Sequence, residues 1–187
     1  ITGFPDTIED KRILSAVREV NQNIARCEDA MDGAVSAAET VLLWNGGASA
    51  CGWFDALTAT HVQFDLLDEM YLSFEKLAKY RVAVLPAGLL LTQTQQEMLC
   101  DYVRQGGRLL AEGLGHGWTA AFCGMLGVQA VREESGPLTA AYLRMEENAP
   151  LRKDLENNSL LPLRGRVAYV QKAEAAQTLL TLVPPFA

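Results

Sequence analysis

The sequence has few of the residues on which metal centres and cross-linked folds depend. Its 187 residues include two histidines, His61 and His116, and four cysteines. The cysteines stand singly at positions 27, 51, 100 and 123, and no two form a CxxC pair. Zinc sites and disulfide frameworks use closely spaced ligands or a recognisable cysteine pattern. We therefore expect no metal, no cofactor, and reduced thiols rather than disulfides.

Clustered cations and long apolar runs are also missing. The net charge is −7, and the 16 lysines and arginines form no block, so the phosphate contacts of a nucleic-acid surface are not provided. No apolar run approaches the roughly 20 residues of a membrane span, and the polar start lacks a signal-peptide pattern. We expect a cytoplasmic protein that binds neither nucleic acid nor membrane. A start without Met and a stop at PPFA suggest a segment of a longer protein.

What the sequence does have is an alternation of short apolar strands with helices. Strands are expected at residues 40–45, 61–68, 81–87 and 108–113, and helices at 53–59, 73–81, 92–106 and 118–126. Such alternation predicts a three-layer αβα, flavodoxin-like fold with a doubly wound, mainly parallel sheet over residues 36–187. A further strand at 166–171 and a last helix at 173–182 complete the expected elements.

Residues 1–35 are expected to form a separate N-terminal linking helix. Its apolar positions recur at steps of four and three residues, at Ile13, Val17, Val20, Ile24, Cys27 and Met31. This spacing predicts one apolar stripe. A capping box at residues 6–10 would begin the helix, and Gly33 would end it. The stripe fits either packing on its own domain or pairing with a partner helix.

The run from residue 77 to 115 resembles the trimerisation domain of bacterial β-galactosidases. The positions that carry the resemblance are Tyr80, Pro86, Tyr102, Val103, Gly106 and Gly107, preceded by the strand TVLLWN. A close cousin is the glutamine-amidotransferase-like domain of other glycoside hydrolases. The resemblance implies a class I glutamine amidotransferase-like domain that does not cut sugar bonds. It implies two partners, a catalytic barrel in the same chain and further copies of the chain.

The same resemblance makes the turn after the fourth strand informative. Enzymes of this superfamily carry G-x-C-x-G there, with a downstream histidine and an acidic partner. This sequence has Gly113 to Gly117, with Gly115 at the thiol position, and no histidine after residue 131. Cys51 and His61 are expected at opposite ends of the sheet, so they do not replace the missing pair. We therefore expect this segment to have no catalytic residue.

Ligands of doubly wound sheets bind at the carboxyl ends of the strands. The candidate ligand or interface contacts at these ends are Asn45, Trp53, Glu112, His116 and Trp118. His116, near Glu112, could bind a sugar hydroxyl or a carboxylate, or could simply lie in a glycine-rich turn. The tryptophans could stack on carbohydrate, anchor an interface, or pack in the core.

Three functional hypotheses follow. The first is a non-catalytic accessory domain of a glycoside hydrolase, which serves oligomerisation and completes a neighbouring active site. The second is a stand-alone amidotransferase-like protein, binding or enzymatic, with a site rebuilt around Glu112, His116 and Asn45. The third is a dimerisation scaffold that uses the first helix.

Overall fold

The computed structural model describes residues 10–113, 117–134, 136–147, 149–155 and 157–184. Contacts between residues divide the chain into two units, Ile1–Ala37 and Ala38–Ala187, which are treated separately below. The capping box expected at residues 6–10 falls mostly outside the described residues.

The first unit contains one long helix, α1 (Lys11–Met31). The carboxylate of Asp10 caps it by accepting a hydrogen bond of 2.9 Å from the backbone N–H of Arg12. No residue of α1 is buried, and the apolar stripe is open: Ile24 is 60% exposed and Met31 69%. The predicted helix is confirmed, and within its own unit nothing described covers the stripe.

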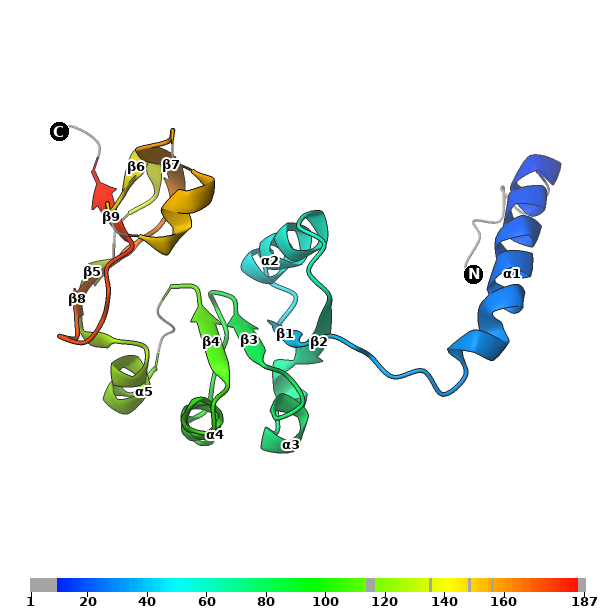
Figure 1. Ribbon diagram of the computed structural model, residues 1–187, viewed down its shortest axis with the longest axis horizontal. Coiled ribbons are helices and arrows are strands. Elements are labelled where there is room, and N and C mark those ends of the chain that lie inside the picture. Colours follow the sequence, from blue (N-terminus) through cyan, green and yellow to red (C-terminus); the bar gives the residue numbers. More distant parts are fainter. Residues whose placement is uncertain (1–9, 114–116, 135, 148, 156, 185–187) are drawn as a thin grey trace. The chain divides into compact units, whose positions relative to one another are not determined.

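The second unit is built on a four-stranded parallel sheet (Figure 1). Its strands are β1 (Thr40–Trp44), β2 (Phe64–Asp68), β3 (Val82–Leu85) and β4 (Arg108–Ala111), in the order β2-β1-β3-β4. The helices that follow them are α2 (Ala48–Ala59), the 3-10 turn η2 (Glu69–Tyr71), α3 (Phe74–Leu77), α4 (Gln93–Arg104) and α5 (Ala120–Met125). The strand order and alternation confirm the predicted doubly wound, flavodoxin-like fold.

Helices cover both faces of this sheet, which explains why its central strands are apolar throughout. Val41 and Leu43 of β1 belong to a core cluster with Leu99 of α4 and Phe122 of α5. Leu42, which lies between them and points to the other face, is also fully buried. A strand that is buried on both faces reads as a continuous apolar run, as β1 does.

The residues that carry the sequence resemblance have a structural role before β3 and β4. The hydroxyl of Tyr80 donates a hydrogen bond of 2.8 Å to Asp65, and that of Tyr102 donates one of 3.0 Å to the Tyr80 carbonyl. Burial and then the bond to Asp65 raise the pKa of Tyr80 to about 12. Gly107 lies directly against the Tyr102 ring. These contacts join β2 to the segments that lead into β3 and β4.

After α5 the chain forms two small antiparallel sheets. In one, β5 (Val128–Glu134) pairs with β8 (Ala168–Lys172). In the other, β6 (Leu138–Met145) lies between β7 (Leu160–Gly165) and β9 (Leu180–Val183), with the 3-10 turn η3 (Pro150–Asp154) between β6 and β7. The predicted strand at 166–171 is confirmed as β8.

One expected helix does not form, and several expected boundaries were wrong, among them the end of the helix expected at 73–81, which stops at Leu77. The last helix expected at 173–182 does not form, because Leu180 and Leu182 alternate along β9 and pair with β6. Helix α2 begins at Ala48, five residues before the expected start at residue 53. Strand β2 begins at Phe64, because His61 has a φ of 56° in the turn that precedes it.

A capping box begins α4. The Thr92 hydroxyl accepts a hydrogen bond from the Gln95 N–H at 3.3 Å, and the Gln95 side chain accepts one from the Thr92 N–H at 2.9 Å. Replacing Thr92 with alanine is expected to lower the free energy of unfolding by about 1 kcal/mol. Urea denaturation measures this, and Thr94→Ala, an exposed site in the same turn, is the control. Equal losses in both variants would contradict a capping role.

Candidate functional site

The candidate site lies at the carboxyl ends of β1, β3 and β4. The chain passes from β1 outward to β2 and returns to the other side of β1 as β3, so the strand order reverses between β1 and β3. Such reversal points are where open α/β sheets bind ligands. Three residues follow these strand ends: Ser49 in the first turn of α2, Ala87 after β3, and Glu112 directly after β4.

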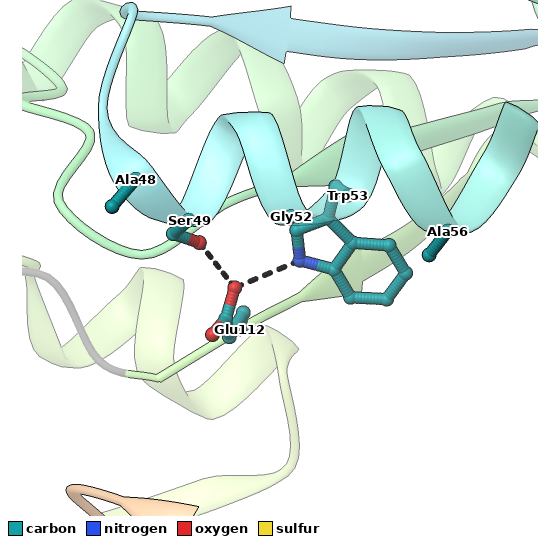
Figure 2. A pocket seen from close by; sticks show the side chains of 6 residues that line it. All are labelled: Ala48, Ser49, Gly52, Trp53, Ala56 and Glu112. Atoms are coloured by element: carbon teal, nitrogen blue, oxygen red, sulfur yellow. Dashed lines mark hydrogen bonds between the residues drawn. The ribbon is translucent and has the colours of Figure 1, made fainter.

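Hydrogen bonds join these strand ends through one carboxylate oxygen. Oε2 of Glu112 accepts a hydrogen bond from the Ser49 hydroxyl and a second, of 2.8 Å, from the indole Nε1 of Trp53 (Figure 2). The N–H of Ala87 donates to the Ser49 Oγ at 2.9 Å and lies 3.5 Å from the same carboxylate oxygen. We call Ser49, Trp53, Ala87 and Glu112 the Glu112 cluster.

A shallow depression of about 510 Å³ opens beside the Glu112 cluster. It is lined by Ala48, Ser49, Gly52, Trp53, Ala56 and Glu112 (Figure 2). Five of these residues come from α2, and Glu112 comes from the end of β4. In Figure 2 the indole of Trp53 is seen face on, with its nitrogen turned towards Glu112. The lining is therefore mostly apolar, with a hydroxyl and a carboxylate at one side.

The structure brings together two of the predicted site residues, Trp53 and Glu112. Asn45 lies in the turn between β1 and α2, where its side-chain oxygen accepts a hydrogen bond of 2.9 Å from the Gly47 N–H. Trp118 is half-buried and packs edge-on against Phe122, with ring centroids 5.0 Å apart, next to the core. His116 lies outside the described residues.

Sequence reasoning missed Ser49. The expected start of α2 at residue 53 left Ser49 in a loop, whereas the observed helix puts it in the first turn. Its partner Glu112 is 63 residues away in the sequence, so their contact depends on the pairing order of the strands. The sequence signal that could have placed Ser49 in a helix is the run of small residues after Gly47. This run closely follows a buried strand, which is where a helix is expected to begin.

The hydrogen bonds of the cluster hold its side chains in place. The Ser49 Oγ both accepts a hydrogen bond from Ala87 and donates its proton to Glu112. Among the described residues, no group of three or more His, Cys, Asp or Glu could hold a metal ion. No helix in this part of the chain has the length and apolar character to cross a bilayer.

Comparisons with known proteins identify the fold. No protein-family model matches the chain, and no curated protein matches it. An α-L-fucosidase from Paenibacillus thiaminolyticus matches at a TM-score of 0.60 and 18% identity, over 89% of this chain and 26% of the fucosidase. A ThuA-like protein from Bacteroides uniformis matches at 0.59 and 15%, over 81% of this chain and 71% of that one.

A glutamine amidotransferase from Thermotoga maritima matches at a TM-score of 0.56 and 13% identity, over 77% of this chain and 66% of the amidotransferase. Identities this low show the fold alone. The chain has the flavodoxin-type fold of glutamine amidotransferase-like proteins, and it spans about a quarter of the length of the fucosidase.

Proposed function

We propose that this chain is a non-catalytic accessory domain of a glycoside hydrolase. It holds subunits together and helps to complete the active site of a neighbouring catalytic barrel. One observation carries the non-catalytic part of the proposal. The side-chain donors of the Glu112 cluster are already hydrogen-bonded to the carboxylate of Glu112.

Convergent hydrogen-bond donors at strand ends are what an acyl-transfer enzyme needs for a developing oxyanion. Here the donors of Ser49 and Trp53 are directed at the chain's own carboxylate, on Glu112. The turn after β4, where the resemblance puts a cysteine nucleophile, begins with this glutamate. In this arrangement the two donors are engaged by the chain's own negatively charged group.

Two further observations support the accessory role. The fold occurs as part of a longer α-L-fucosidase, of which the matched region is about a quarter. Within the first unit, the described residues leave most of the apolar stripe of α1 open, and an open stripe of this kind is typical of a surface that packs against another chain or domain. Oligomerisation through α1 would bury it.

One observation favours the second candidate, a stand-alone amidotransferase-like binding protein. This chain covers 66% of the length of the matched amidotransferase and 71% of the length of the ThuA-like protein, so most of each of those proteins matches this domain. A domain of this kind would use the depression beside Trp53 as its own ligand site.

The proposed function is tested on the purified chain by two measurements. Light scattering over a concentration series is expected to give a defined oligomer at micromolar concentration. Ile24→Glu, which puts a charge into the apolar stripe, is expected to yield monomers. Gln22→Glu adds the same charge elsewhere on α1 and is the control, expected to leave the mass unchanged. A monomer at every concentration would contradict self-sufficient oligomerisation.

The second measurement is catalysis. Ammonia release from glutamine and hydrolysis of aryl glycosides are both expected to stay at the level of a buffer blank. Glutamine hydrolysis that scales with protein concentration and disappears in Glu112→Ala would overturn the non-catalytic assignment and favour the second candidate.

A further inference from the structure

We propose that the depression beside Trp53 and Glu112 binds a neutral pyranose sugar. This goes beyond the proposed function, because neither oligomerisation nor a neighbouring active site requires a carbohydrate site on this domain. The proposal rests on the fixed indole, the acceptor beside it, and the small residues that leave the ring accessible.

The indole of Trp53 is held in one orientation. Its Nε1 donates to Glu112 at 2.8 Å, so the ring is fixed at its polar edge. One face of a pyranose presents C–H groups with slight positive charge, which pack against the electron-rich face of an aromatic ring. A ring already fixed by a hydrogen bond loses little side-chain freedom when a sugar stacks on it.

Small side chains leave room next to the ring. Gly52 and Ala56, one position before and three after Trp53 on α2, both line the depression. Residues three apart on a helix are neighbours on its surface, so a larger side chain at position 56 would cover the indole. A Cβ added at Gly52 would meet no atom within 4 Å, so the space beside it is open.

Glu112 supplies the acceptor that sugar hydroxyls need. Among the described residues, all the hydrogen bonds that Glu112 accepts fall on Oε2, which leaves Oε1 for a ligand. A carboxylate oxygen accepts hydrogen bonds from hydroxyl groups and donates none. An apolar ring face next to a hydroxyl acceptor matches a pyranose, whose faces are apolar and whose edge carries hydroxyl groups.

Charge and shape select against other small ligands. The carboxylate of Glu112 and the net charge of −7 repel an anionic sugar. A quaternary ammonium ion is typically enclosed by several aromatic faces, whereas among the described residues that line this depression Trp53 alone is aromatic. A neutral sugar is not repelled by the carboxylate of Glu112, and it needs only one aromatic face to stack on.

Titration calorimetry of the full chain with the methyl glycosides of galactose, fucose and mannose tests the proposal. At least one is expected to bind saturably. Trp53→Ala is expected to weaken binding at least about tenfold, a loss of about 1.4 kcal/mol. Ala56→Leu changes an exposed residue outside the Glu112 cluster, so it keeps the fold while covering the indole, and it is expected to weaken binding similarly.

Trp44→Phe is the matched control, because the Trp44 ring packs edge-on against Phe54, 6.2 Å away, and does not line the depression. It is expected to bind the sugar as the parent chain does. Saturable binding of none of the glycosides would overturn the proposal. So would binding unaffected by Ala56→Leu, or equal or tighter Trp53-dependent binding of tetramethylammonium or glucuronate. Each of these results is independent of the oligomer mass and of glutamine hydrolysis, which test the proposed function.

Discussion

A Gly107→Ala variant is expected to lose about 2–3 kcal/mol of unfolding free energy. A Cβ at position 107 would lie 2.3 Å from Cζ of Tyr102 and 2.4 Å from both neighbouring ring carbons. The ring cannot simply move away, because Tyr102 is only 3% exposed and its hydroxyl is hydrogen-bonded to the Tyr80 carbonyl. Either this bond breaks or the backbone before β4 shifts.

Urea denaturation of Gly107→Ala and Gly124→Ala compares two glycines with opposite surroundings. A Cβ at Gly124, inside α5, would meet no atom within 4 Å. Alanine there is expected to be neutral or to stabilise by up to about 1 kcal/mol, since glycine is a poor helix former. A Gly107→Ala variant as stable as the parent chain would show that the Tyr102 ring is not packed against position 107.

The Gly107 contact also shows why parts of this fold were predictable from sequence. Glycine at positions 106 and 107 ends α4 and lets the next strand start close to a tyrosine ring, so the sequence pattern and the packing have one cause. Likewise, the run of apolar residues in β1 predicted a strand buried on both faces, because that burial is what permits the run. Local sequence patterns were enough to predict the structure where the local preference of the residues and their packing in the fold favour the same conformation.

Prediction from local patterns was wrong where the local preference and the packing favour different conformations. Residues 173–182 contain alanines at Ala173, Ala175 and Ala176, which favour a helix, but the end of this segment pairs with β6 as β9. The preference for a helix at Ala173–Ala176 is smaller than the gain from strand pairing and burial. Such pairing is set by residues far away in sequence, which a local pattern does not contain.

For the candidate site, the positions of some residues were predictable from the sequence, but the contacts between them were not. Trp53 and Glu112 could be placed at strand ends because each follows a recognisable strand. Their hydrogen bond, and the part played by Ser49, depend on β1 and β4 lying on either side of β3. That order is a property of the whole sheet.

Replacing Glu112 with alanine is expected to lower the free energy of unfolding by about 2 kcal/mol. The hydroxyl of Ser49 and the Nε1 of Trp53 lose a charged acceptor, and hydrogen bonds to charged groups contribute about 1.5–3 kcal/mol each. Glu112 is exposed, so water replaces part of this loss. Glu112→Gln keeps a carbonyl acceptor without the charge and is expected to lose about half as much.

A double-mutant cycle with Ser49→Ala separates this bond from general effects of the substitutions. We expect a coupling free energy of about 1 kcal/mol between positions 49 and 112 in urea denaturation. Glu97→Ala, an exposed carboxylate on α4 that is bonded to Gln93, is the control and is expected to change stability by less than about 0.5 kcal/mol.

A coupling near zero would mean that the Ser49 hydroxyl is not committed to Glu112. This hydroxyl would then be available to a substrate, and the main argument for a non-catalytic domain would be weakened. A clear coupling would mean that the Ser49 hydroxyl is bound to the chain's own carboxylate, which also accepts the hydrogen bond of the Trp53 indole on which the proposed sugar stacks. The stability of one hydrogen-bonded pair therefore bears on both functional proposals.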